Sequence, residues 1–283
     1  MKINLAISAG FCFGVKRAIN IALKTAKTNK PVFMLGDIVH NEEVVKQIKK
    51  AGIKKIDHFS CGDGKIMLIR AHGCSRNTLQ KVKASGYTII DATCPMVKEI
   101  HAIAKKLEDN GFQIIVIGDK SHDEVKGITG QLRTKALVID KLENIPFNKI
   151  KPISRAGIVV QSTQNLDKVQ KIIDILRNNI RKVEFHNTIC NPTRMKQNEI
   201  KIMPLENDVM VIIGSKTSAN TKRIYEISKS LNKKSYWINS SNEIKKNWID
   251  KTESVGITAG ASTPESTIQE VIRKIRNLTF RKQ

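Results

Sequence analysis

The feature that most constrains this chain of 283 residues is a repeat in which a polar heptapeptide follows a cysteine at a constant distance. The leading glycines of the three heptapeptides, Gly36, Gly118 and Gly214, each lie 24 residues after their cysteine. The heptapeptides read GDIVHNE, GDKSHDE and GSKTSAN, and the cysteines are Cys12, Cys94 and Cys190. A fixed internal order of this kind predicts three structural units of similar build.

Short apolar runs alternate with amphipathic stretches, a pattern typical of α/β proteins. The predicted strands cover residues 3–7, 31–35, 65–69, 87–91, 112–117, 157–160, 209–213 and 255–258. The predicted helices cover residues 14–27, 42–51, 97–107, 166–178, 193–205, 221–231 and 264–278. Because helices follow the apolar strands, we expect parallel sheets covered by helices, with ligands at the carboxyl ends of the strands.

The expected architecture is three α/β lobes with mainly parallel sheets, related by a pseudo-threefold axis. The lobes cover residues 13–92, 93–188 and 189–283, and residues 1–12 are expected to complete the third lobe. No linker rich in proline, glycine or serine separates them. Equivalent positions converge if three such lobes pack around one axis, so the three cysteines would meet at the centre.

Three thiolates without an evident fourth ligand suggest an iron–sulfur cluster with one open iron, a Lewis acid for a substrate oxygen. A zinc site is a second interpretation, although zinc usually draws two ligands from a Cys-x-x-Cys knuckle, which this sequence lacks. Inert core cysteines are a third, and spacing alone leaves all three open. Five scattered cysteines do not form a disulfide framework, and they predict a reducing, cytoplasmic compartment.

Polar side chains would converge together with the cysteines. Those that lie 28 residues after their cysteine are His40, His122 and Ser218. Those that follow the second predicted strand of each unit are His72, Ser162, Thr163 and Ser262. With Asn220 and a helix N-terminus, these groups are donors that suit a diphosphate. The carboxylate of Glu124 is unfavourable beside phosphate unless it handles a proton.

The chain is strongly basic, with 49 lysines and arginines against 26 aspartates and glutamates and a net charge of +23. Such a balance suits nucleic acid, a phosphorylated ligand or an acidic protein. A nucleic-acid-binding or redox-sensing protein that uses a cluster as a switch is therefore a rival interpretation. It lacks support, because the basic residues are spread along the chain and aromatic residues are only 5%. The sequence shows no signal-peptide pattern and no apolar run of about 18 residues, so we expect no membrane segment.

Eight short motifs, in order along nearly the whole chain, carry a family resemblance. They read GFCFGVKRA (10–18), GDIVHN (36–41), AHG (71–73), DATCP (91–95), HDEV (122–125), TIC (188–190), GSK (214–216) and TAGAS (258–262). This series resembles that of the LytB-type 4-hydroxy-3-methylbut-2-enyl diphosphate reductases, which end the non-mevalonate isoprenoid pathway.

The resemblance implies an iron–sulfur reductase with one 4Fe-4S cluster. It implies that the cluster ligands are Cys12, Cys94 and Cys190. The implied diphosphate-binding residues are His40, His72, His122, Ser218, Ala219, Asn220 and Ser262. At the substrate hydroxyl it implies His122, Glu124 as the source of protons, and Ser162 or Thr163. Two electrons and two protons would remove the hydroxyl as water and yield isopentenyl or dimethylallyl diphosphate. Apart from the resemblance, the net charge of +23 suggests an acidic ferredoxin or flavodoxin as the electron donor, with a compositional bias of the whole chain as the alternative explanation of the charge. Neither nucleic acid nor membrane is an expected partner.

The chain departs from the family pattern at several positions. Ser162 stands for a threonine, Ala219 for a serine and Asp123 for a proline, and Lys196-Gln197 stands for an arginine–glutamine pair. Asp123 adds a negative charge beside the expected proton donor. These departures leave open a pseudo-enzyme or a reductase for another hydroxylated diphosphate. Cys61 and Cys74 match no family motif, and we expect them to be free thiols.

Overall fold

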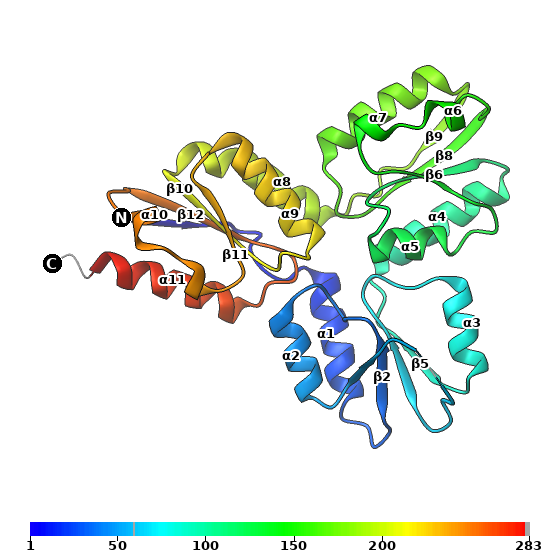
Figure 1. The fold of residues 1–283 in the computed structure, drawn as a ribbon, viewed down its shortest axis with the longest axis horizontal. Helices are drawn as coiled ribbons and strands as arrows, with labels where there is room; N and C mark the ends of the chain where they lie inside the picture. The colour runs from blue at the N-terminus through cyan, green and yellow to red at the C-terminus, as the bar shows by residue number, and fades with distance from the viewer. Residues whose placement is uncertain (59, 281–283) are drawn as a thin grey trace. The chain divides into compact units, whose positions relative to one another are not determined.

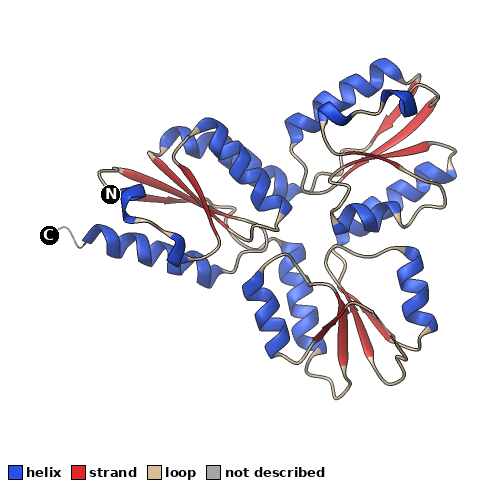
Figure 2. Ribbon diagram, viewed as in Figure 1, coloured by secondary structure: helices blue, strands red, loops and turns tan. Residues whose placement is uncertain are grey.

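The computed structural model describes residues 1–58 and 60–280, which form two compact units. The first unit comprises Met1–Lys16, His40–Lys46 and the residues from Asn191 onward, and the second comprises Arg17–Val39 and Gln47–Cys190. Within them lie three four-stranded sheets whose strand pairs are all parallel (Figure 2). The expected α/β fold with parallel sheets in three lobes is confirmed.

The three sheets are built from short strands. The sheet of the first unit has the order β1-β12-β10-β11, with strands Lys2–Leu5, Ser254–Ala259, Val209–Ile213 and Ser235–Ile238. One sheet of the second unit has the order β3-β2-β4-β5, with strands Lys54–Ile56, Val32–Leu35, Ile66–Ile69 and Thr88–Asp91. The other has the order β7-β6-β8-β9, with strands Leu137–Ile139, Gln113–Ile117, Arg155–Val160 and Lys182–Phe185.

The same strand order recurs in each sheet. The strand that leads into a glycine heptapeptide (β2, β6 or β10) is central, and a second central strand (β4, β8 or β12) pairs with it. The strand that precedes a cysteine (β5, β9 or β1) lies at the edge beside the second central strand. The N-terminal strand β1 therefore belongs to the sheet of β10–β12, while the lobe boundaries at residues 92 and 188 stay a prediction.

Helices cover both faces of each sheet (Figure 1). In the first unit, α8 and α9 lie on one face and α10 and α11 on the other; they are Asn191–Glu206, Ala219–Leu231, Lys246–Ile249 and Glu265–Phe280. Along β2–β5, α1 and α2 face α3; they are Phe13–Thr25, Glu42–Lys50 and Arg76–Ala84. Along β6–β9, α4 and α5 face α6 and α7; they are Pro95–Asp109, Asp123–Thr129, Phe147–Ile150 and Leu166–Asn179. Single 3-10 turns occur at Leu142–Asn144 and Ser241–Glu243.

The central strands are apolar on both faces because helices cover both. In β6, Ile115 and Ile117 pack in a cluster with the residues of α7. Their neighbours Ile114 and Val116 pack instead with residues of α4 and α5. Side chains of a strand alternate between faces, so a sheet buried on both sides requires a continuous apolar run. This is why the sequence pattern located β6, β8, β10 and β12.

The sequence pattern missed the short outer strands. The predictions did not include the strands β3, β7, β9 and β11, nor the helices α3, α5, α6 and α10. Three of these strands are exposed or half-buried along most of their length, so they carry no continuous apolar run. No helix within residues 1–58 and 60–280 has the length and apolar character needed to span a lipid bilayer.

We predict that Leu107→Ala destabilises the protein. The Leu107 side chain is 2% exposed and packs between α4 and β8, so its truncation should lower the free energy of unfolding by about 2–5 kcal/mol. Urea denaturation followed by circular dichroism measures this change. Leu205→Ala is the matched control, because Leu205 is 68% exposed and its truncation should change stability by less than about 0.5 kcal/mol. Equal destabilisation by both variants would contradict this core assignment.

Candidate functional site

The three repeat cysteines occupy the same local position in the three sheets. Each lies directly before the first residue of a helix, namely α1, α4 or α8. Each backbone N–H also donates to a carbonyl two residues beyond the end of the second central strand. These bonds are Cys12 N to Ala261 O (3.1 Å), Cys94 N to Ala71 O (2.9 Å) and Cys190 N to Ser162 O (3.1 Å). The repeat seen in the sequence is therefore also a repeat in backbone geometry.

The chemistry of these cysteines fits a metal cluster. All three thiols are half-buried, and no disulfide occurs among the described residues. A helix N-terminus favours a thiolate, and the backbone N–H of Val15 lies 3.5 Å from Cys12 Sγ. Thiolates are the ligands of iron–sulfur clusters. The other two cysteines differ, because Cys61 is exposed and burial raises the pKa of the Cys74 thiol to about 11.

A buried carboxyl group lies at the start of α5 in the second unit. The Glu124 side chain is 2% exposed, and both of its oxygens contact Ser162. Oε1 accepts the Ser162 backbone N–H (2.6 Å), and Oε2 accepts the Ser162 hydroxyl (2.8 Å). The two bonds fix the plane of the carboxyl group against the end of β8.

Burial raises the pKa of Glu124, and the two hydrogen bonds from Ser162 oppose this rise. Water stabilises a carboxylate much better than a protein interior does, so burial favours the protonated form. A carboxylic acid with a raised pKa can hold a proton near neutral pH and deliver it to a reacting group. This is the electrostatic setting that a general acid requires.

Two histidines lie beside this carboxyl group in the second unit. His122 caps α5, and its Nδ1 accepts the backbone N–H of Glu124 (3.2 Å). A neutral ring in this arrangement carries its proton on Nε2. The ring of His72 meets that of His122 edge to face, with centroids 5.4 Å apart. Imidazoles that follow two different strands, β4 and β6, are thus brought together.

The structure distinguishes the two adjacent hydroxyls that the sequence left as alternatives. Ser162 bonds to Glu124, whereas the hydroxyl of Thr163 accepts the side-chain N–H of Gln161 (3.0 Å). Gln161 in turn accepts the backbone N–H of Asp119 (2.9 Å), which links the end of β8 to the heptapeptide after β6. Gln161 was not singled out from the sequence, although it directly follows the predicted strand 157–160.

A second group of candidates gathers at the N-terminus of α9 in the first unit. The Ser218 side chain caps the helix by accepting the backbone N–H of Thr221 (3.3 Å), and Ala219 is the first helical residue. Asn220 is 5% exposed, and its Nδ2 has no hydrogen-bond partner among the described residues. Buried polar groups normally have partners, so this donor needs an acceptor from a ligand or water.

The His40 segment belongs to the same unit. The hydroxyl of Ser262 donates to the backbone carbonyl of His40 (2.9 Å), which ties this segment to the loop after β12. Glu42 begins α2, as expected for a helix N-terminal residue, and it accepts the hydroxyl of Ser215 (2.8 Å). Both contacts hold residues 40–42 against the loops of the sheet β1-β12-β10-β11.

The candidate residues fall into two sets, one in each unit. The set of the first unit is Cys12, His40, Ser218, Ala219, Asn220 and Ser262. The set of the second unit is Cys94, Cys190, His72, His122, Glu124, Ser162 and Thr163. Convergence of the three cysteines at one point stays a prediction from the repeat.

A buried lysine supports the segment before Cys12. The Lys196 ammonium donates to the backbone carbonyls of Ser8, Gly10 (3.2 Å) and Ala259 (3.0 Å). Glu199, one helical turn later, accepts the backbone N–H of Ser8 (3.1 Å). Lysine stands at position 196 for the arginine of the family pattern, so a cation is still buried in the first unit. No sequence motif pointed to this role.

The comparisons with known proteins agree with one another. A family model described as LytB protein matches residues 3–276. A 4-hydroxy-3-methylbut-2-enyl diphosphate reductase of Campylobacter hominis is 39% identical over 98% of this chain and 100% of its own length. The enzyme of that name from Aquifex aeolicus is 38% identical over 98% of this chain and 96% of its own.

Two solved structures are similar along nearly the whole chain. One, of (E)-4-hydroxy-3-methyl-but-2-enyl diphosphate reductase, the terminal enzyme of the non-mevalonate pathway, has a TM-score of 0.73 and 37% identity, and covers 98% of this chain and 100% of its own. The other, the E-1-hydroxy-2-methyl-but-2-enyl-4-diphosphate reductase of Plasmodium falciparum, has a TM-score of 0.88 and 27% identity over 96% of this chain and 87% of its own. Because the family model and these relatives span nearly all of its residues, the chain belongs to the LytB family.

Proposed function

We propose that this chain is a 4-hydroxy-3-methylbut-2-enyl diphosphate reductase, which removes the substrate hydroxyl as water and yields isopentenyl and dimethylallyl diphosphate. The observation that carries the proposal is the buried Glu124 carboxyl, held by Ser162 beside His122. Its raised pKa suits a reaction that consumes protons. The printed names of the relatives in the LytB family support the same reaction.

We propose that Cys12, Cys94 and Cys190 hold one 4Fe-4S cluster. Their matching positions at helix N-termini and their half-buried thiols support this assignment. When bound, such a cluster supplies electrons, and its iron without a cysteine ligand acts as a Lewis acid for the substrate hydroxyl. Thiolate ligands need a reducing compartment, which fits the cytoplasmic location expected from the cysteines.

The substrate diphosphate needs hydrogen-bond donors that carry no negative charge. The proposed residues are His40, His72, His122, Ser218, Ala219 through its main chain, Asn220 and Ser262. The buried Nδ2 of Asn220 supports this assignment, because it needs an acceptor. The N-terminus of the 13-residue helix α9 adds backbone N–H groups that favour an anion.

Glu124 is the proposed proton source, and Ser162 orients it. The carboxyl group can give its proton toward the hydroxyl end of the substrate while Ser162 keeps its plane fixed. His122, capping the same helix, carries its ring proton on Nε2 and can donate there. Thr163 is proposed to support the end of β8 through its bond to Gln161.

The electron donor is proposed to be a small acidic ferredoxin or flavodoxin. The net charge of +23 supports docking of an acidic protein, since opposite charges accelerate association at low salt. A donor of this kind passes one electron at a time, so two successive transfers to the cluster would supply the two electrons of the reduction.

We expect the reconstituted protein to convert 4-hydroxy-3-methylbut-2-enyl diphosphate anaerobically with an artificial one-electron donor. Glu124→Gln should lower kcat by about 10²–10⁴-fold, because the amide has the same shape but cannot deliver a proton. Product formation followed by chromatography measures both. Glu143→Gln, which alters an exposed glutamate, is the control and should keep full activity. Near-normal turnover by Glu124→Gln would exclude the proposed acid.

A ligand test concerns the cluster itself. After anaerobic reconstitution, Cys94→Ala should lose most of its iron and the Mössbauer signal of a 4Fe-4S cluster, because a thiolate ligand is missing. Cys61→Ala removes an exposed thiol that we do not assign to the cluster, and it should keep both. Full iron content in Cys94→Ala would refute the ligand assignment.

The pH dependence of stability tests the buried carboxyl group. Burial raises the pKa of Glu124 above its ordinary value of 4.5, so between the two values the folded protein binds more protons than the unfolded chain. The free energy of unfolding contributed by this group therefore falls as pH rises through that range. Glu124→Gln should gain stability relative to the unmutated protein as pH increases, as measured by urea midpoints. A difference that stays constant with pH would contradict the raised pKa.

A further inference from the structure

An ion pair joins two segments of the second unit that carry proposed site residues. Arg70 Nη1 lies 2.7 Å from Asp123 Oδ2, and the two side chains are only 21% and 23% exposed. Arg70 directly follows β4 and comes two residues before His72. Asp123 is the first residue of α5 and lies between His122 and Glu124. One contact therefore links the backbone segments that present all three of these side chains.

The surrounding residues leave room for this contact. Gly36 has a φ of +73°, and a Cβ atom there would lie 2.5 Å from Arg70 Nη1. A side chain at position 36 would thus displace the guanidinium group. A small cavity of about 250 Å³ adjoins the pair and is lined by Arg70, Asp123, Ser75 and Lys126, among others. The cavity leaves the ion pair packed on only part of its surface.

The far end of α5 is held by other bonds. The backbone N–H of Arg76 donates to the Gly130 carbonyl (2.9 Å), and the Gln131 side chain donates to the Cys74 carbonyl (2.7 Å). The helix has only seven residues, so its direction depends on how both ends are fixed. At its N-terminal end, Asp123 bonds to Arg70, Glu124 bonds to Ser162, and the ring of His122 contacts that of His72.

We propose that Arg70 and Asp123 are positioning residues, which set where α5 presents His122 and Glu124 next to His72. This inference rests on the proposed reductase function for its kinetic consequence, but not for its structural one. A proline at the first helical position has a fixed φ suited to the helix. The φ of an aspartate is not fixed in this way. The ion pair with Arg70, a residue outside the helix, fixes the first turn instead. The ion pair also compensates the negative charge of Asp123, which is next to Glu124, the proposed proton source.

The kinetic test uses Asp123→Asn, which keeps the size and removes the charge. We expect kcat to fall about tenfold or more, because small displacements of a catalytic group are costly, while cluster content and thermal midpoint stay close to those of the unmutated protein. Arg70→Met should have a similar effect, and the double variant should be no worse than either single one. Asp123→Pro should recover most of the activity, since it restrains the same turn without a charge. Additive losses in the double variant would overturn the proposal.

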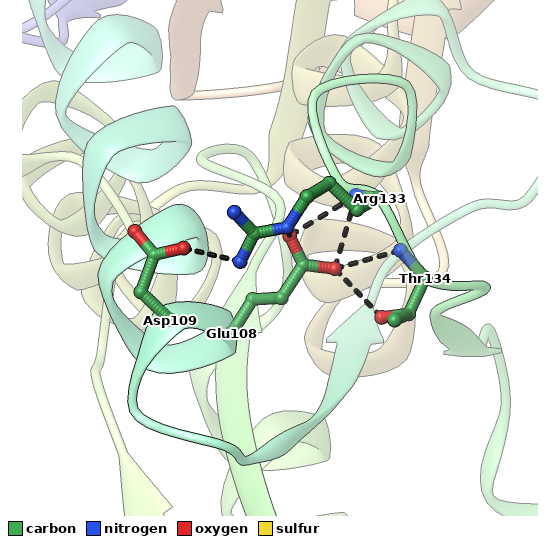
Figure 3. A network of polar contacts seen from close by, with 4 residues as sticks. All are labelled: Glu108, Asp109, Arg133 and Thr134. Atoms are coloured by element: carbon green, nitrogen blue, oxygen red, sulfur yellow. Dashed lines mark hydrogen bonds and ion pairs between the residues drawn. The ribbon is translucent and has the colours of Figure 1, made fainter.

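The matched control is another aspartate–arginine pair of the same unit. Asp109 pairs with Arg133, as Figure 3 shows. Asp109 is the last residue of α4, whereas Cys94 lies at the start of that helix. Both side chains are more than half exposed. Asp109→Asn should therefore leave kcat unchanged, and an equal loss in this variant would assign the effect to charge removal in general.

A second measurement separates this inference from the proposed function. Hydrogen–deuterium exchange of the amides of residues 123–126 should become faster in Asp123→Asn and Arg70→Met but not in Asp109→Asn, whether or not the protein turns over any substrate. Unchanged exchange at the start of α5 would overturn the positioning role. Absence of turnover by the unmutated, cluster-loaded protein would instead refute the proposed reductase activity and leave the exchange result to decide this inference.

Discussion

Parallel pairing of strands is the constraint on which the rest of this structure depends. In a parallel sheet all carboxyl ends lie at one edge, so residues from distant parts of the chain meet there. The hydrogen bond from each cysteine N–H to the loop after the neighbouring strand extends this pairing beyond the sheet. The cysteines are thereby fixed by the backbone, whatever side chains surround them. This explains how three segments of different sequence keep the same geometry.

The chemistry of the second unit depends on a balance between burial and hydrogen bonding. A carboxyl group without water gives up its charge unless donors compensate it. Two donors from one residue, Ser162, partly compensate Glu124, so the group keeps a raised pKa and a fixed plane at the same time. A stronger compensation, such as an arginine, would hold the carboxylate charged and end its use as an acid. The ion pair of Asp123 with Arg70 keeps such a charge close by without contacting Glu124.

The sequence predicted the features that depend on local pattern. The central strands β6, β10 and β12 are continuous apolar runs, and each ends in a polar phrase that the structure places at a strand end. The outer strands β3, β7 and β9 were missed, because most of their residues are exposed or half-buried and they carry no continuous apolar run. Contacts between residues that are far apart in the sequence could not be predicted either. Arg70 and Asp123 are 53 residues apart, and nothing local to either distinguishes a paired charge from a solvated one.

The pairing of β1 with β12 has a consequence for the order of synthesis. Lys2 pairs with Ser254, so β1 waits for a partner strand that is made about 250 residues later. At roughly 5–20 residues per second this delay is on the order of 10 to 50 seconds. Until then Cys12 lacks the carbonyl of Ala261 that positions it. The strands of the second unit are all made before then, whereas Cys12 is positioned only after Ala261 has been made. A metal centre that used all three cysteines would therefore wait for the synthesis of Ala261.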